Sequence, residues 1–422
     1  MTAGPAAGVA AGRREVADRS ARWFREWYGR GPEGVWFAPG RVNLVGEHTD
    51  YNEGFVLPFA LGQGVVAAAA RREDDVLALR TRRDPGASVE IPLERLRPGS
   101  SGSGLGGPPP GGRGDIPGWA RYPAGVAWSL LSAGYPVAGV SLAIDSCLAD
   151  GAGLSSSAAL ECSVALALTE LNGAAGGPGG GAISRPALAA IARRAENEFV
   201  GVPSGIMDQS ASLLCRADHA LLLDCQSLES SQVPFAPAAA GIRVLVIDTR
   251  AKHELIDGEY GGRQAECREA ARRLGVPSLR SVTDVSALAA LQDPVLERRA
   301  RHVITDNQRV QEVAALLRSS GGGDARTLAD VGALLTQSHR SLRDDFEVSW
   351  PEADAAVDTA VAAGALGARM IGGGFGGSAI ALVPDTDTGQ VEARIRVAYA
   401  DRGWTEPEFL TAVPSDAAQR LP

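Results

Sequence analysis

Strand-like and helix-like segments are mixed along this chain without the strict β-α-β alternation that builds a parallel sheet. Short apolar runs predict strands, and longer runs with one apolar face predict helices. The expected strands are residues 35–37, 65–70, 140–144, 219–224, 242–248 and 378–383. The expected helices are residues 122–133, 156–171, 186–199, 262–274, 299–318, 328–338 and 352–364. This order predicts an α+β fold in two domains, residues 1–215 and 216–422.

Local signals refine two of the expected helix starts. Ser184 is placed to cap the helix that begins near Pro186, and proline suits a first helical turn. Ser349 and Glu352 have the spacing of a capping box, with a proline between them, that would open the helix at 352–364.

Three segments are expected to lie outside the packed core. Residues 1–12 are small and mostly uncharged, which predicts a frayed terminus. Residues 99–118 and 173–181 are dense in glycine and proline and cannot bury enough apolar area to order themselves. We expect both to be surface insertions rather than domain linkers.

The basic residues exclude several kinds of nucleotide and nucleic-acid binding. Lys252 is the only lysine among 41 basic residues, and no glycine-rich P-loop ending in lysine occurs. The formal net charge is −9, and the arginines are scattered among acids rather than clustered. A nucleic-acid partner would require a basic face, so we expect none.

Cysteine usage and hydropathy indicate a cytoplasmic protein. The five cysteines show no C-x-x-C pair and no zinc-binding spacing, as expected of reduced thiols in a cytosol. No stretch approaches the roughly 18 apolar residues that span a bilayer. The N-terminus lacks the apolar core of a signal peptide. We therefore expect a soluble protein with no membrane partner.

The segment that follows the first expected strand is unusually polar. Residues 41–50 place Arg41, Glu47, His48 and Asp50 beside apolar side chains, which is costly unless the polar groups line a cleft. A metal site is one interpretation, but Glu47 and His48 are adjacent and their side chains diverge. A polyol-binding site fits better, because carboxylates accept hydrogen bonds from hydroxyls and imidazole can donate or accept them.

A second segment predicts an anion site at a helix start. Gly151 and Gly153 precede Ser155, Ser156 and Ser157, where a long helix is expected to begin. Free N–H groups and the positive end of the helix dipole attract phosphate, and glycines let its oxygens approach. Serine hydroxyls can donate to phosphate or bind Mg²⁺. The pattern is common, but it offers a phosphate site without lysine.

A third segment brings two acids close to a turn. Glu196 ends an expected helix, and Asp208 follows a turn that contains Pro203 and Gly205. Apolar neighbours place the Asp208 carboxyl in surroundings where a nearby guanidinium would keep it ionised. The alternative is that Asp208 is a helix N-cap.

A fourth segment matches the G-x-G-x-x-G pattern through Gly372, Gly374 and Gly377. Dinucleotide binding needs a strand before this pattern and a helix after it, whereas here we expect a helix before and a strand after. We therefore discount a dinucleotide and expect close backbone approach to a ligand or a neighbouring loop.

Together these segments resemble the galactokinases, a family of the GHMP kinase superfamily. The resemblance rests on GRVNLVGEHTDYN at 40–52, GAGLSSSAA at 151–159, SGIMDQ at 204–209 and GGGFGG at 372–377. It implies an N-terminal domain with a ribosomal-protein-like α/β layer and a C-terminal ferredoxin-like domain. The active site would lie between the two domains.

The resemblance also implies ATP-dependent phosphorylation of the anomeric hydroxyl of galactose, the first step of galactose catabolism, with Mg²⁺. Asp208 would take the proton from that hydroxyl, and Arg41 would stabilise the carboxylate. The matching sugar-contacting residues are Glu47, His48, Thr49, Asp50, Gly205 and Tyr260. The matching ATP-binding residues are Gly151, Ala152, Gly153, Leu154, Ser155, Ser156, Ser157 and Trp119. The matching Mg²⁺ ligands are Ser157 and Glu196.

Two alternatives to a galactose kinase remain at this point. One is a kinase for a related sugar, such as N-acetylgalactosamine or arabinose. The other is a non-catalytic regulator that binds ATP and galactose on the same fold. The intact serine-alanine stretch, together with Arg41, Glu196 and Asp208, favours an enzyme. We expect a monomer whose partners are galactose and ATP.

Overall fold

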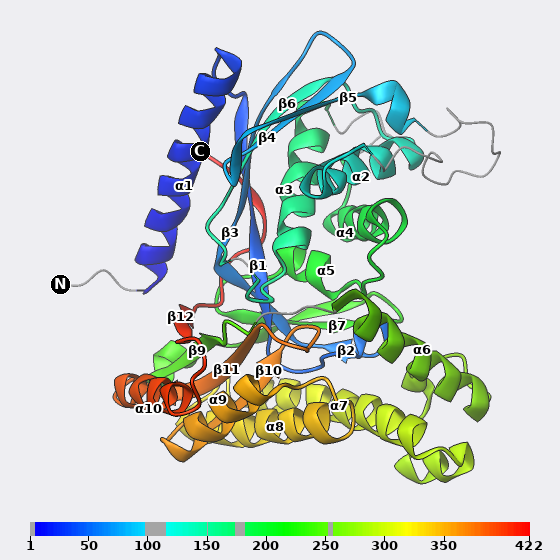
Figure 1. The fold of residues 1–422 in the computed structure, drawn as a ribbon, viewed down its shortest axis with the longest axis vertical. Coiled ribbons are helices and arrows are strands. Elements are labelled where there is room, and N and C mark those ends of the chain that lie inside the picture. The colour runs from blue at the N-terminus through cyan, green and yellow to red at the C-terminus, as the bar shows by residue number, and fades with distance from the viewer. Residues whose placement is uncertain (1–4, 98–114, 150, 174–181, 252–255) are drawn as a thin grey trace.

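The computed structural model describes residues 5–97, 115–149, 151–173, 182–251 and 256–422 (Figure 1). Most of the two expected insertions, 99–118 and 173–181, therefore lies outside the described residues. Among the described residues, no helix is long and apolar enough to cross a membrane.

In the described part of its first half, the chain combines a long sheet with five α-helices. Its helices are α1 (Pro5–Tyr28), α2 (Gly118–Ser132), α3 (Ser156–Leu171), α4 (Arg185–Arg194) and α5 (Met207–Leu214). Its strands are β1 (Gly34–Asn43), β2 (Phe55–Val56), β3 (Pro58–Arg71), β4 (Val76–Thr81), β5 (Asp84–Pro92) and β6 (Val140–Ser146). A π-helix, Ala195–Val200, continues α4.

The second half supplies a smaller sheet and most of the long helices. Its helices are α6 (Ile256–Leu274), α7 (Pro294–Ser319), α8 (Ala325–Asp344), α9 (Pro351–Ala362) and α10 (Thr388–Ala400). Its strands are β7 (His219–Asp224), β8 (Ser230–Pro234), β9 (Ile242–Asp248), β10 (Gly367–Ile371), β11 (Ser378–Pro384), β12 (Glu408–Ala412) and β13 (Gln419–Leu421).

The described strands form three sheets. Their orders are β13-β1-β3-β6-β4-β5, β10-β11-β9-β12 and β2-β7-β8. Among the described residues, every strand pair is antiparallel except β4 with β6. Antiparallel sheets with helices packed on their faces confirm the expected α+β class. The last strand, β13, pairs with β1 and so completes the sheet of the first half.

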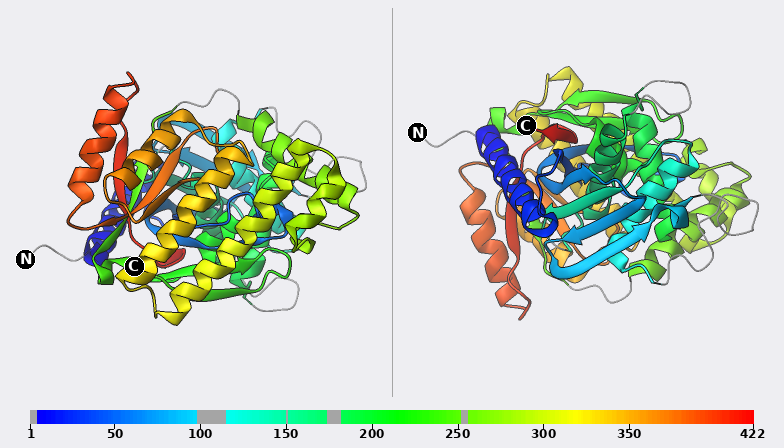
Figure 2. Two further views of the ribbon diagram at one scale, coloured as in Figure 1. Left: turned by 90° about the horizontal axis from the view of Figure 1, so that it is seen from below. Right: turned by 90° about the horizontal axis from the view of Figure 1, so that it is seen from above.

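The central strand β3 is buried on both faces, which explains its run of alanines. Ala67 and Ala69 pack in the cluster that includes the buried side of α3, whereas Ala68 and Ala70 pack against Phe24 of α1. Alternate residues of a strand point to opposite faces, and small side chains let a helix approach each face. Figures 1 and 2 show α1 on one side of this sheet and α2 to α5 on the other.

The N-terminal prediction was wrong for residues 5–12, which belong to helix α1. The alanines of this segment favour a helix, and a tertiary contact from the next residue holds it. The Arg13 guanidinium donates to the carbonyls of Leu61 and Gly62, each at 3.2 Å. The terminus is therefore tied to the start of β3.

The expected capping box at residue 349 was also wrong. Helix α9 starts at Pro351, its N-cap is Trp350, and that cap makes no side-chain hydrogen bond to the helix. The Ser349 hydroxyl instead donates to Asp354 Oδ1 at 2.5 Å. The serine thus satisfies an acid one turn into the helix rather than a free backbone N–H.

Two further elements differ from expectation near the polar segments. The expected helix 186–199 ends at Arg194, and the π-helix that follows carries Glu196. Strand β10, rather than a helix, leads into Gly372, so the glycine segment joins two paired strands. The exclusion of a dinucleotide stands, because no helix follows this segment.

Candidate active site

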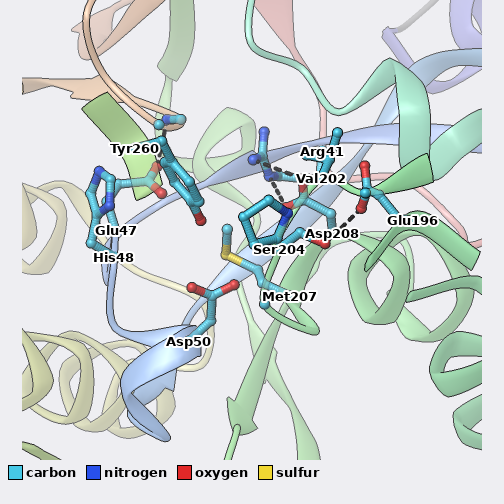
Figure 3. Close-up of a pocket in the computed structure, with 15 residues that line it drawn as sticks. Arg41, Glu47, His48, Asp50, Glu196, Val202, Ser204, Met207, Asp208 and Tyr260 are labelled. Carbon is cyan, nitrogen blue, oxygen red and sulfur yellow. Dashed lines mark hydrogen bonds and ion pairs between the residues drawn. The ribbon is translucent and has the colours of Figure 1, made fainter. Parts of the chain in front are cut away.

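A cavity of about 330 Å³ lies where the polar segments meet, a size that suits a small ligand. Figure 3 shows Glu47, His48 and Tyr260 on one side of it, with Arg41, Asp208 and Glu196 on the other. Its lining includes eight residues expected from the sequence: Arg41, Glu47, His48, Asp50, Glu196, Gly205, Asp208 and Tyr260.

Asp208 is held by an arginine and a serine. Arg41 donates from Nε to Asp208 Oδ1 at 2.9 Å and from Nη2 to Oδ2 at 3.2 Å. This bidentate pairing fixes the plane of the carboxylate. The Ser155 hydroxyl donates to Oδ2 at 2.5 Å. Asp208 lies in the first turn of α5 and does not cap it, because the N-cap is Ile206.

The loop before α3 is fixed by contacts from both halves of the chain. Arg41 Nη1 donates to the carbonyl of Gly153 at 2.6 Å, and its backbone N–H donates to Leu154 O at 3.2 Å. The Ser378 hydroxyl donates to Ala152 O at 2.7 Å. The arginine that holds Asp208 therefore also positions this loop beside it.

The start of α3 keeps its amides available. Ser155 is the N-cap, with φ near +58°, and its side chain makes no bond to the helix amides. The first amides of a helix have no intrahelical partner, so these N–H groups can bind an anion. Ser156 and Ser157 form the first residues of the helix. The helix start therefore has free amides that suit an anion without any lysine.

Glu196 faces the cavity with three side-chain donors around it. The Ser204 hydroxyl and Gln209 Nε2 donate to its Oε2 at 2.7 and 2.8 Å, and Ser157 also hydrogen-bonds the carboxylate. Burial raises the pKa of Glu196, and the charge of Asp208 raises it further. A cation placed beside these two acids would relieve this cost.

The donor set therefore fits Mg²⁺. Magnesium is usually held by one or two carboxylates together with phosphate oxygens and water. Glu196 and Ser157 would supply a carboxylate and a hydroxyl next to the anion site at α3. The described residues contain no group of three His, Cys, Asp or Glu side chains that could hold a metal ion. Phosphates would have to complete the coordination.

The opposite wall is built from residues that accept and orient hydrogen bonds. Glu47 is buried, and its Oε1 accepts from the N–H of Gly372 at 2.9 Å. His48 Nδ1 lies 2.8 Å from the Tyr51 hydroxyl, and the imidazole ring packs against Tyr260. Burial lowers the pKa of His48 to about 3, so this imidazole is neutral at physiological pH.

Asp50 and Gly205 form the floor of the cavity in close contact. A Cβ added at Gly205 would overlap the Asp50 carboxylate, so only glycine fits beside this acid. Burial raises the pKa of Asp50 to about 6, and the negative charge of Asp208 contributes to the rise. Asp50 is therefore ionised at neutral pH but titrates in the mildly acidic range.

The resemblance to galactokinases implies that Asp50 contacts the sugar, and this pKa then predicts a pH-dependent affinity. Below about pH 6 Asp50 gains a proton and loses capacity to accept hydrogen bonds from hydroxyls, so KM for the expected substrate, galactose, should rise as pH falls. An Asp50→Asn variant should have a higher KM that changes little between pH 5 and 8, in initial-rate measurements at saturating ATP. The same pH dependence of KM in that variant would show that another group is responsible.

Nine expected site residues do not line this cavity: residues 151–157 at the start of α3, Thr49 and Trp119. The Thr49 hydroxyl lies 2.8 Å from Gly46 O and 2.7 Å from Phe55 O, so it binds the loop's own backbone. Trp119, in the first turn of α2, is partly buried against the hydrophobic core. Their contacts with sugar and ATP stay predictions.

Comparisons with known proteins agree along the chain. The galactokinase galactose-binding signature matches residues 22–71, the N-terminal domain of GHMP kinases matches 121–216, and the C-terminal domain of GHMP kinases matches 313–400. A galactokinase of Streptomyces coelicolor is 48% identical over 410 residues, which cover 96% of this chain and 99% of that protein. This chain belongs to the galactokinase family. The human galactokinase is 41% identical over 380 residues, covering 87% and 88% of the two chains.

Solved structures agree with this family assignment. The crystal structure of Lactococcus lactis galactokinase complexed with galactose superposes with a TM-score of 0.86 at 30% identity, covering 96% of this chain and all of that one. The mevalonate kinase of Methanococcus jannaschii, at 16% identity and a TM-score of 0.61, shares the fold alone. The expected two-domain GHMP kinase fold is confirmed.

Sequence reasoning about this galactokinase-family site missed some supporting residues. Ser204 and Gln209 both donate to Glu196, and Gln209 Nε2 also donates to the fully buried Glu161 at 3.0 Å. Both lie in the SGIMDQ stretch at 204–209, which marked the segment but not the contacts of these two side chains. Glu161 lies one turn inside the expected helix and carried no signal, because a single acid among apolar residues has many interpretations.

Proposed function

We propose that this chain transfers the γ-phosphoryl group of ATP to the anomeric hydroxyl of galactose, the first step of galactose catabolism. One observation carries the proposal. Asp208, which is hydrogen-bonded by Arg41 and Ser155, lines the same cavity as Glu47 and Asp50. A sugar on that wall could present a hydroxyl to Asp208, beside the helix start that suits phosphate.

Asp208 would act on the attacking hydroxyl. Its Oδ2 is 2.5 Å from the Ser155 hydroxyl, and its side chain keeps 27% exposure toward the cavity. A carboxylate in this place can accept the proton of the sugar hydroxyl as phosphoryl transfer proceeds. Arg41, a fixed cation, pairs with the carboxylate and keeps it oriented until the proton arrives.

The helix start and the metal would manage the phosphate charge. Phosphoryl transfer depends mainly on positioning and on stabilising charge on the transferred group. The α3 amides would bind phosphate oxygens, and Ser157 with Glu196 would hold Mg²⁺, which neutralises charge on the β- and γ-phosphates. The remaining ATP contacts would come from residues 151–156 and from Trp119.

We also propose a cytoplasmic location, a monomeric state and a domain boundary near residue 215. All five cysteines are free thiols, which suits a reducing compartment. The fully antiparallel sheet of β9 to β12 lies almost entirely after that boundary, together with α6 to α10. The strand β13 returns to the first sheet, so the second domain would end within the first.

A sugar panel tests the proposed function. We expect ADP release to depend on galactose and on Mg²⁺, to stop when EDTA is added, and to be highest in kcat/KM for galactose among galactose, N-acetylgalactosamine, arabinose and glucose. A higher kcat/KM for another sugar would correct the substrate. Sugar binding without ADP release would instead favour the non-catalytic regulator.

A further inference from the structure

A buried arginine lies behind the sugar-facing wall. Arg369, in strand β10, is 0% exposed. Its Nη1 donates to the carbonyls of Asn43 and Leu44, at 3.1 and 3.0 Å. These carbonyls lie where β1 ends and the polar loop begins. Arg369 therefore ties the second domain to the backbone that leads into Glu47.

The rest of this guanidinium is directed at Glu47. Nη2 lies 3.8 Å from Glu47 Oε1, and neither Nη2 nor Nε has a hydrogen-bond partner among the described residues. The same Oε1 accepts from Gly372 N–H, which follows directly after β10. One short segment thus supplies both a charge and a hydrogen bond to the same carboxylate oxygen. The Glu47 side chain that they hold lines the cavity.

The buried Arg369 cation opposes the effect of burial on the pKa of Glu47. Burial raises the pKa of Glu47, and Arg369 is the strongest of the charges that oppose the rise. A carboxylate accepts hydrogen bonds at both oxygens, whereas a protonated carboxyl gives up part of that capacity. Without a cation, burial would favour the protonated form.

We propose that Arg369 is a positioning residue for galactose recognition, which holds the Glu47 carboxylate and the adjoining loop in the arrangement that accepts a sugar hydroxyl. This inference rests on the proposed function, because it gives the Glu47 wall a sugar to bind. Arg369 itself does not line the cavity, so it acts through the loop backbone and the Glu47 carboxylate.

Helix α7 holds the same loop from another side. His302 Nε2 lies 3.1 Å from Glu47 O, and Asp306 Oδ2 accepts from Gly46 N–H at 3.2 Å. These contacts fix the backbone, whereas the positive charges that act most strongly on the Glu47 carboxylate, among the described residues, are Arg369 and then Arg41. The titratable and charged groups that surround Glu47 are Arg41, Asp50, Tyr260, His302, Asp306 and Arg369.

A double-mutant cycle tests the inference. Arg369→Met, Glu47→Gln and the double variant are compared in KM for galactose and KM for ATP, after thermal melting has shown that each is folded. Each single change should raise KM for galactose about tenfold or more, with KM for ATP nearly unchanged. If Arg369 acts through Glu47, KM for galactose in the double variant should stay close to that of the single variant with the higher KM. Independent effects would multiply to about a hundredfold, and that outcome would overturn the proposal.

A pH profile separates positioning from general damage. Removing the cation should raise the pKa of Glu47, so KM for galactose in Arg369→Met should rise more steeply than in wild type as pH falls from 8 to 6. In the double variant, KM for galactose should depend on pH no more steeply than in wild type. That variant keeps Asp50 and His302 but lacks the Glu47 carboxyl. A profile parallel to wild type would contradict the proposal.

Two more variants guard against a folding artefact. Arg299 is a buried arginine that pairs with Glu266 and Glu347 outside the cavity, so Arg299→Met should lower the melting temperature but leave KM for galactose unchanged. If Arg369→Met does not fold, the same cycle is run with Arg369→Gln, which also removes the charge but keeps a polar side chain. Wild-type protein without activity on galactose would refute the proposed function instead.

Discussion

Replacing Asp208 by alanine should lower kcat for galactose phosphorylation by about 10²- to 10⁴-fold, the usual contribution of a positioned general base. The variant also leaves Arg41 with an unpaired buried charge, because its side chain is only 6% exposed. KM for galactose should change far less, since Glu47, Asp50 and Tyr260 still line the cavity. A coupled assay of ADP release at saturating ATP and Mg²⁺ measures both constants.

The control for this experiment is an acid that faces solvent. Asp358 is exposed on helix α9, away from the cavity lining, and Asp358→Ala should keep wild-type kcat. Asp208→Asn separates shape from charge, because it preserves the size of the side chain but cannot take a proton. Full turnover in Asp208→Asn would remove Asp208 as the base and leave it the task of orienting the hydroxyl.

Gly205→Ala should reduce kcat/KM for galactose by about 10²-fold, because displacing a binding group by about 1 Å can cost that much. The added Cβ would overlap the Asp50 carboxylate and push it away from the sugar site. The loss should fall mainly on KM for galactose. KM for ATP should stay close to wild type, because the α3 start is not displaced. Initial rates over a range of both substrates give these constants.

Gly389 provides the control for this experiment, because an added Cβ has room there. A Cβ at Gly389, in the first turn of α10, meets nothing within 4 Å. Gly389→Ala should therefore leave the kinetics unchanged and stabilise the protein by about 0.4–1 kcal/mol through the unfolded state. If Gly205→Ala behaved like Gly389→Ala, the close packing of Asp50 on Gly205 would have no role in sugar binding.

Much of the fold could be predicted from apolar patterns, but the element ends could not. The strands expected at 35–37 and 65–70 are the middle parts of β1 and β3, which run over Gly34–Asn43 and Pro58–Arg71. Their ends carry polar, glycine or proline residues whose strand conformation depends on partners elsewhere in the chain. Helix α1 was missed for the same reason, since Arg13 finds its acceptors in residues 61 and 62.

The members of the site were easier to predict than their pairings. Glu47, Asp50, Glu196 and Asp208 stood out as acids near glycine turns, and the structure gathers all four around one cavity. The contact of Ser155 with Asp208 could not be predicted, because a serine before a helix is expected to cap it. This contact joins residues 53 positions apart and follows from the packing of α3 on α5.

The alanine run of β3 bears on how this family can diverge. Ala67 and Ala69 meet one helical layer and Ala68 meets the other, so a larger side chain would have no free side at any of these positions. Overpacking of this kind typically costs about 1–3 kcal/mol. A bulkier residue in the strand would be tolerated only alongside a smaller one in α1 or α3. Divergence at the centre of this sheet is therefore expected to proceed by paired substitutions between a strand and a helix.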